Sequence, residues 1–280
     1  MRLLIFFISF ASIIVFLFFY YNKTALDGGI ENKTRFTISN FSKKYEYLIF
    51  LNDEPIYSGS NMTYFHWQGF PIKNGTNKLK FIFKSIVNSS KDNIVTRLNT
   101  IIFDGGQENK SVSINIPLKQ EKETEHTIYF NITKKSFNRY FIYDDLSNSP
   151  HLEIAKDIKK FTLYYVHLLT SRNFKSINKI FKNKNISTNY PKWFVQSEDK
   201  DLKVTAVDKE DDLKVILGKQ MILVVPSNKF VKKFKVKSLY SIERVKDNTK
   251  ISESCYSFAK YEDKWCIIER EGNLIPIAIQ

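Results

Sequence analysis

The longest apolar run of the chain lies at its start. Between Leu3 and Tyr21 only Ser9 and Ser12 are polar. A helix of this length spans about 28 Å, close to the hydrocarbon thickness of a bilayer, and it has no polar face of the kind that a soluble helix shows. The pattern predicts a transmembrane signal anchor at residues 1–21, with the membrane as a partner through residues 3–21.

The alternative is a signal peptide that is cleaved, after which the chain is secreted. The apolar run is longer than the roughly 7–15 residues of a signal-peptide core, and no Ala-x-Ala cleavage site precedes Asn22. We therefore predict a single-pass membrane protein whose bulk is extracytoplasmic, in the periplasm or at the cell surface.

Alternating apolar and polar residues predict strands after a short linker at residues 22–32. Leu79, Phe81 and Phe83 alternate with polar residues, and similar short runs recur at intervals near ten residues up to Tyr143. No helical period interrupts them. The prediction is an all-β sandwich at residues 33–143.

A helical period appears after a second linker at residues 144–150. One apolar stripe predicts a long helix, and a break at Thr170-Ser171 leads to a short second helix. Strand patterns then continue to Ile268, which predicts an α+β domain at residues 151–280, with helices packed on a curved antiparallel sheet. The stripe consists of Ile154, Ile158, Phe161, Tyr165 and Leu168. The predicted fold class is thus an N-terminal transmembrane helix, an all-β sandwich and an α+β domain.

Two segments of the sandwich resemble a pattern of jelly-roll accessory domains in sugar-processing enzymes. They are Leu51-Asn-Asp-Glu-Pro-Ile56 and Asn74-Gly-Thr-Asn-Lys-Leu-Lys-Phe81. Both are turn and strand signals, so the resemblance implies a sandwich. Trp67 and His66 could stack on a saccharide, but core or edge positions are the simpler interpretation.

The C-terminal domain resembles the nuclear transport factor two-like cone fold over roughly residues 151–272. The resemblance rests on the closing segment Phe258-Ala-Lys-Tyr-Glu-Asp-Lys-Trp-Cys-Ile-Ile268 and on the helical segment from Ile158 to Phe181. It implies a pocket between the first helix and the sheet, which some members of the family use for isomerase or cyclase chemistry. The candidate pocket residues are Tyr164, His167, Trp193 and Tyr240.

No motif in the sequence predicts a catalytic residue, a cofactor or a metal site. The four histidines are scattered at positions 66, 126, 151 and 167, and no HExxH, CxxC, glycine-rich phosphate loop or G-x-S-x-G is present. Cys255 and Cys266 are too few for a disulfide framework. If the chain turns at Glu262-Asp263, Ala259 faces Cys266, and free thiols are expected.

The net charge of +14 comes mostly from dispersed lysines. As a strand, Lys229 to Lys237 would direct Lys233, Lys235 and Lys237 outward, toward an anionic surface or simply toward solvent. Aromatic residues do not interleave on this basic face, so we predict no nucleic-acid partner. Other envelope proteins and anionic polymers are the partners that the charge allows, and the sequence sets no oligomeric state.

These patterns favour a membrane-anchored, extracytoplasmic protein without enzymatic activity, which serves as a scaffold or interaction protein of the cell envelope. Two alternatives stay open. One is a small-ligand binder or isomerase-like enzyme that uses the cone pocket, and the other is a carbohydrate-binding surface protein that uses the sandwich.

Overall fold

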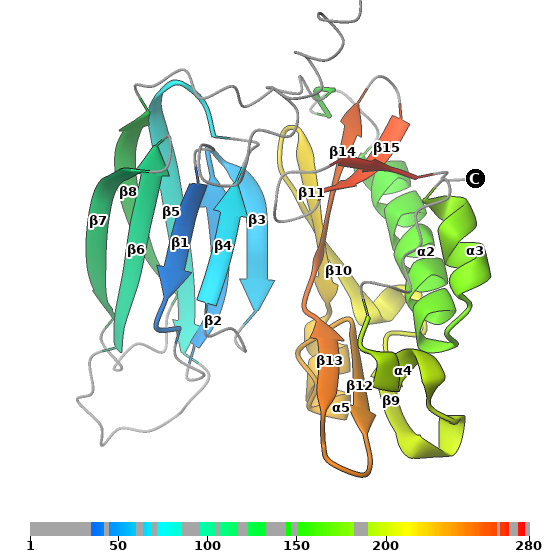
Figure 1. The fold of residues 1–280 in the computed structure, drawn as a ribbon. Coiled ribbons are helices and arrows are strands. Elements are labelled where there is room, and N and C mark those ends of the chain that lie inside the picture. The colour runs from blue at the N-terminus through cyan, green and yellow to red at the C-terminus, as the bar shows by residue number, and fades with distance from the viewer. Residues whose placement is uncertain are drawn as a thin grey trace, which may run out of the picture.

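The structure is a computed structural model of the 280-residue chain, in which two domains lie side by side (Figure 1). It describes residues 35–41, 45–59, 64–68, 72–85, 96–104, 107–116, 123–132, 144–146, 151–181, 190–261, 264–268 and 274–277.

The N-terminal domain is a sandwich of two antiparallel sheets. In the described part of the chain, one sheet has the order β4-β1-β6-β7 and the other has the order β3-β2-β5-β8. Their inner faces share one core, which contains Phe36 and Ile38 of the first sheet and Ile49 and Phe81 of the second. The strands are β1 Arg35–Ser39, β2 Tyr45–Leu51, β3 Glu54–Gly59, β4 Tyr64–Gln68, β5 Gly75–Ser85, β6 Thr96–Asp104, β7 Gln107–Ile116 and β8 Thr124–Ile132.

The period-two alternation that predicts these strands also decides which side chains enter the core. In β2, buried and half-buried side chains alternate along the whole strand, and Tyr47, Ile49 and Leu51 pair with buried residues of β5. Trp67 is 1% exposed and stacks on Phe65 inside this core. It therefore does not face solvent, where a saccharide would bind.

The C-terminal domain packs helices against antiparallel sheets with the orders β10-β11-β14-β15-β16 and β13-β12-β9. Figure 1 shows α2 and α3 on the side of this domain that faces away from the sandwich. The helices are α2 His151–Thr170, α3 Phe174–Ile180, α4 Lys192–Gln196 and α5 Asn228–Phe234, with short 3-10 turns η3 Asp199–Asp201 and η4 Glu210–Asp212. The strands are β9 Leu202–Ala206, β10 Leu213–Leu217, β11 Met221–Pro226, β12 Tyr240–Arg244, β13 Lys250–Glu253, β14 Tyr256–Tyr261, β15 Lys264–Ile268 and β16 Leu274–Pro276.

The apolar stripe of α2 covers the second core. Ile158, Phe161, Tyr165 and Leu168 are buried there, as their spacing predicts. The helix ends at the predicted break, where Arg172 adopts a left-handed conformation with φ of 56°. The next residue, Asn173, caps α3 by accepting a hydrogen bond from the Ser176 amide.

The prediction of a transmembrane helix concerns residues 1–21, which lie outside the described residues. Within the described ranges, no helix is long and apolar enough to cross a membrane. The predicted fold class, which begins with such a helix and assigns a single-pass anchor, is corrected accordingly. The described chain is mostly β-strand with few helices, and its longest helix, α2, is amphipathic, with exposed residues such as Lys156 and His167 on its outer face.

The segment from Lys229 to Lys237 is also corrected, because it forms a helix and a tight cap instead of a strand. Ser227 follows β11 and accepts a hydrogen bond from the Phe230 amide, which begins α5. Phe230 and Phe234 are four residues apart, a spacing that places them on one helical face in contact. Lys235 then ends the helix in the left-handed conformation, with φ of 58°.

The two domains share apolar surface where β3 meets β11. Met221, Ala259 and Ile268 of the second domain belong to the core cluster of the sandwich, and Cys255 and Tyr261 pack against it. Residues 144–146, within the predicted linker, also dock on the second domain, since Leu146 is buried and its amide donates to the Lys219 carbonyl. An apolar contact of this kind favours one fixed arrangement of the two domains.

A buried carboxyl group forms hydrogen bonds across this contact. Glu54, at the start of β3, is 4% exposed. Its carboxylate accepts hydrogen bonds from the amides of Gln220, at 3.1 and 3.2 Å, and Met221, at 2.9 Å. Burial raises the pKa of Glu54 above its usual value of 4.5, and the backbone amides oppose that shift.

Replacing Glu54 with glutamine is expected to change how stability depends on pH. Because the pKa of Glu54 is higher in the folded state than in the unfolded chain, this group contributes most stability below about pH 4.5. The contribution is lost as pH rises through the folded pKa. The wild type should therefore gain stability relative to Glu54→Gln as pH falls from neutral toward 4.5, as measured by denaturant unfolding at each pH. The quantity to follow is the free energy of unfolding of the wild type minus that of Glu54→Gln. If this quantity stays constant or falls on acidification, the pKa of Glu54 is not raised.

Candidate ligand-binding cleft

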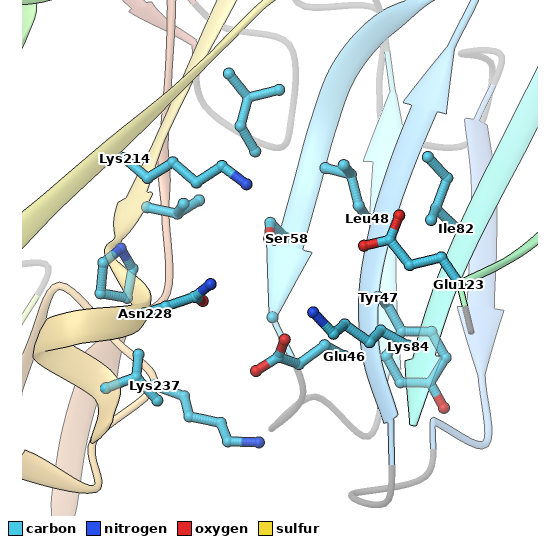
Figure 2. A pocket seen from close by; sticks show the side chains of 15 residues that line it. Glu46, Tyr47, Leu48, Ser58, Ile82, Lys84, Glu123, Lys214, Asn228 and Lys237 are labelled. Carbon is cyan, nitrogen blue, oxygen red and sulfur yellow. The ribbon is translucent and has the colours of Figure 1, made fainter. Parts of the chain in front are cut away.

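A cleft of about 240 Å³ lies between the two domains. One wall is the outer face of the sandwich sheet that contains β2, β3 and β5, and the other is formed by β10, β11 and α5 (Figure 2). The shared core next to Glu54 sets the distance between these walls. The cleft is therefore a property of the assembled pair of domains and belongs to neither domain alone.

Aliphatic side chains contribute to both walls. Leu48 of β2 and Ile82 of β5 are cross-strand partners on the sandwich side. Ile216 of β10 and Val225 of β11 lie on the opposite side, together with Val231 of α5. These positions alternate with core residues along the same strands, which places them on the outer faces of their sheets.

Charged side chains line the cleft beside these aliphatic residues, and their signs differ between the walls. The α+β domain contributes Lys214 and Lys237, whose ammonium groups point toward the sandwich in Figure 2. The sandwich contributes Glu46, Glu123 and Lys84, with both carboxylates directed toward the cleft. None of these five groups forms an ion pair with a residue in the described part of the chain.

Lys237 is the most enclosed of the three lysines in the cleft. Burial lowers its pKa below the usual value, while the nearby charge of Glu46 acts in the opposite direction. A half-buried ammonium without an ion pair gains more from an anionic ligand group than an ammonium that water already solvates. Asn228 and Ser58 add neutral hydrogen-bonding groups on opposite walls.

The three lysines of the predicted basic face lie in different places, because the segment forms the helix α5 and not a strand. Lys233 lies on the surface with its ammonium group 4.5 Å from the centre of the Phe234 ring, and Lys235 is exposed at the helix cap. Lys237 turns into the cleft instead. The three lysines therefore do not form one row, and only Lys237 belongs to the candidate site.

The four predicted pocket residues do not converge on a common cavity. Tyr164 is 52% exposed on the outer side of α2, and His167 is exposed on the same helix. Tyr240 is buried in the second core, and Trp193 of α4 is half-buried at its margin. The prediction that these residues line a shared pocket finds no support in their positions.

Aromatic side chains fill the region where the cone resemblance implies a pocket. The Tyr190 hydroxyl shares hydrogen bonds with the side chains of Tyr165 and Tyr240, and the Tyr256 ring lies 5.4 Å from that of Tyr165. Burial raises the pKa values of Tyr190, Tyr240 and Tyr256, and the charge of the half-buried Glu253 adds to each shift. These hydroxyls stay protonated at neutral pH, so they act as hydrogen-bonding groups of a core and not as general bases.

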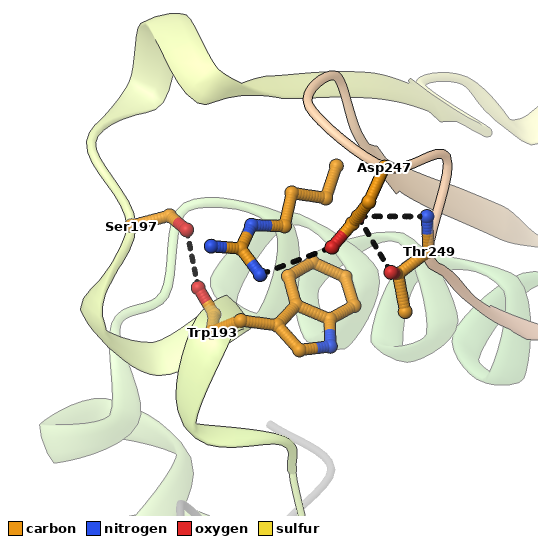
Figure 3. Close-up of polar contacts among 5 residues, drawn as sticks. Trp193, Ser197, Asp247 and Thr249 are labelled. Carbon is orange, nitrogen blue, oxygen red and sulfur yellow. Dashed lines mark hydrogen bonds and ion pairs between the residues drawn. The ribbon is translucent and has the colours of Figure 1, made fainter.

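Trp193 takes part in a polar corner whose bonds are satisfied locally (Figure 3). The Ser197 hydroxyl donates to the Trp193 carbonyl, and Arg172 donates to the Ser197 carbonyl. Asp247 accepts hydrogen bonds from the amide and hydroxyl of Thr249, and these bonds lower the pKa of Asp247. Its carboxylate also forms an ion pair with the guanidinium of Arg244 in the same turn. The first two bonds stabilise the end of α4 and the bonds of Asp247 stabilise the β12–β13 turn, so the cleft is the stronger candidate site.

The described residues contain no group of three or more potential ligands that could hold a metal ion. Cys255 and Cys266 form no disulfide bond, and Cys266 pairs with Ala259 across β14 and β15, as the predicted hairpin requires. Burial raises the pKa of Cys266, which keeps this thiol protonated and unreactive.

Comparisons with known proteins leave the site to be interpreted from its own geometry. No protein-family model matches the chain, and neither a curated protein nor a solved structure matches it. The resemblances to the cone fold and to jelly-roll accessory domains therefore stay predictions.

Proposed function

We propose that this chain is a non-enzymatic interaction protein, which holds part of a partner in the cleft between its two domains. The observation that carries the proposal is the set of charged side chains, contributed by both domains, that face one another across the cleft without forming ion pairs among the described residues. Charges kept in a partly enclosed site are stabilised when a partner supplies their complements.

Two further observations favour binding over catalysis. The interior of the second domain is filled by aromatic and aliphatic side chains, so a core occupies the region where the resemblance to the cone fold implies a pocket. Among the described residues that line the cleft are lysines, carboxylates and neutral polar groups, but no histidine or cysteine. Tyr47 contributes to the lining from a buried core position.

A photocrosslinking amino acid tests this proposal in the cells that produce the protein. Benzoylphenylalanine replaces Ser58 on the sandwich wall or Asn228 on the opposite wall, and Glu108 on the exposed edge strand β7 serves as the control position. We expect both cleft positions to crosslink one and the same partner under ultraviolet light, while the Glu108 position does not crosslink it. Mass spectrometry of the products identifies the segment that occupies the cleft.

A charge-reversal variant makes the crosslinking result specific for the cleft. Lys214→Glu with Lys237→Glu removes the positive wall while retaining the fold, because Lys214 is exposed and Lys237 is only half-buried. The crosslinked product should be lost in this variant. A product that persists unchanged, an equal product from the Glu108 position, or no product from either cleft position contradicts the proposed function.

A further inference from the structure

The two walls of the cleft have the periodicity of the strands that form them. On β10, Lys214 and Ile216 are two residues apart and line the cleft, whereas Val215 between them packs on the second core. On β2, Glu46 and Leu48 are likewise two residues apart and line the opposite wall. Each wall is therefore a sheet face on which an apolar residue and a charged residue are neighbours.

An extended segment is the conformation that fits between two such faces. Successive side chains of a strand point in opposite directions, so one set meets each wall. A helix with its side chains is about 10 Å or more across, and a folded domain is larger still. A cleft of about 240 Å³ holds a few side chains and not elements of that size.

The charges on the walls specify the sequence of such a segment. Lys214 and Lys237 require acidic side chains on the face toward the α+β domain. Glu46 and Glu123 require basic side chains on the face toward the sandwich. Lys84 lies opposite Glu46 on the neighbouring strand, so this wall has two carboxylates and one ammonium group. Acid and base must therefore alternate along the segment, together with aliphatic residues that meet the aliphatic side chains of both walls.

We infer that the cleft binds an extended peptide segment of a partner protein in which acidic and basic residues alternate around an aliphatic centre. The inference rests on the proposed function and adds the chemistry and the conformation of the bound segment. Binding orders the segment as a strand between the two domains, with its acidic side chains on the lysine wall and its basic side chains on the carboxylate wall.

Two blocked hexapeptides of identical composition test the alternation. In acetyl-Glu-Lys-Val-Ile-Glu-Lys-amide, an extended backbone places both acids on one face and both bases on the other. In acetyl-Glu-Glu-Val-Ile-Lys-Lys-amide, each face carries one acid and one base. Titration of each labelled peptide against the full chain, followed by fluorescence anisotropy, should give affinity about tenfold or more in favour of the first peptide. Equal affinity overturns the inference.

A change of specificity provides a second readout that loss of folding cannot imitate. Lys214→Glu with Lys237→Glu makes both walls acidic, so the variant should lose affinity for the alternating peptide about tenfold and should gain affinity for acetyl-Lys-Lys-Val-Ile-Lys-Lys-amide. The matched control is Lys232→Glu with Lys233→Glu, which reverses two lysines of α5 outside the cleft and should preserve the preference of the wild type. A variant with unchanged preference overturns the inference.

The remaining occupants of the cleft have distinct outcomes in the same experiments. Competition by free glutamate or lysine as strong as that by the peptide would identify a small zwitterion as the ligand, and self-association that requires Lys214 and Lys237 would identify a second copy of this chain. Either result overturns the peptide inference. Crosslinking to a partner from Ser58 and Asn228, combined with no discrimination between the two hexapeptides, would leave the proposed function in place and reject only the bound chemistry.

Discussion

Gly218→Ala is expected to destabilise the chain by about 2–3 kcal/mol, since it forces a side chain into the contact between the domains. A Cβ atom at this position would lie 2.1 Å from Oε2 of Glu54 and 2.6 Å from Cδ of Pro55. Neither group can move freely, because backbone amides hold the carboxylate and the proline ring belongs to β3. The measurement is denaturant unfolding followed by tryptophan fluorescence, which reports Trp67 in one domain and Trp193 and Trp265 in the other.

The neighbouring residue supplies the control for this prediction. Lys219 is exposed in the same turn, so Lys219→Ala should change the free energy of unfolding by no more than about 0.5 kcal/mol. Combining Gly218→Ala with Glu54→Ala should cost less than the sum of the single changes, because the second change removes one of the two clashing groups. Equal stability of Gly218→Ala and Lys219→Ala would show that the interface tolerates a side chain there.

Asn77→Ala is expected to cost about 3 kcal/mol of stability, because it removes a buried side chain that makes four hydrogen bonds to the loops at one end of the sandwich. Asn77 is fully buried on β5. Its side chain accepts hydrogen bonds from the Lys73 amide at 2.9 Å and from the Asn52 side chain at 2.8 Å, and it donates to the carbonyls of Lys73 and Gly75. Alanine would remove all of these hydrogen bonds at a position that is itself fully buried. The measurement is again the free energy of unfolding.

Thr76→Ala is the matched control for Asn77→Ala. Thr76 is exposed on the same strand, and its hydroxyl donates to the Asn131 side chain at the surface. Its loss should change stability by no more than about 0.5 kcal/mol. Asn77→Asp adds a sharper comparison, because it retains the acceptors but removes the two donated hydrogen bonds. If Asn77→Ala and Thr76→Ala unfold alike, the buried network does not contribute as we expect.

The Asn77 network explains why the sequence pattern in the sandwich is structural. Asn52 and Asp53 both have positive φ and form the tight turn between β2 and β3. The Asn52 side chain then reaches across to Asn77 and accepts a hydrogen bond from the Lys78 amide. The two segments that resemble the jelly-roll pattern therefore contact each other through hydrogen bonds that stabilise the turn, which is a structural role and not that of a ligand site.

Local periodicity determined much of the described secondary structure. Alternation placed Tyr47, Ile49 and Leu51 in the core because side chains of a strand change face at every residue. The 4-3 spacing in α2 and the cap at Asn173 likewise depend on residues within one helical turn. Such patterns can be recognised without knowing what lies across the fold.

Several expectations from the same patterns differ from the structure. Lys229 to Lys237 alternates well enough to suggest a strand, but the Ser227 cap and the burial of Phe230 favour a helix. The transmembrane helix of the predicted fold class has no counterpart among the described helices. Tyr164 and His167 were expected to line a pocket, yet the rotation of α2 on the sheet directs them to solvent.

The sequence by itself determined where strands and helices form in most of the described chain, and that Cys266 faces Ala259, because these features depend on neighbouring residues. Only the tertiary structure decided that Glu54 joins the two domains and that Glu46, Glu123, Lys84 and Lys214 face one cleft with Lys237. In the sequence, nothing distinguishes these residues from other polar residues of strands and loops. Their common site exists because the apolar contact between β3 and β11 brings two outer sheet faces together, and no local pattern encodes that distance.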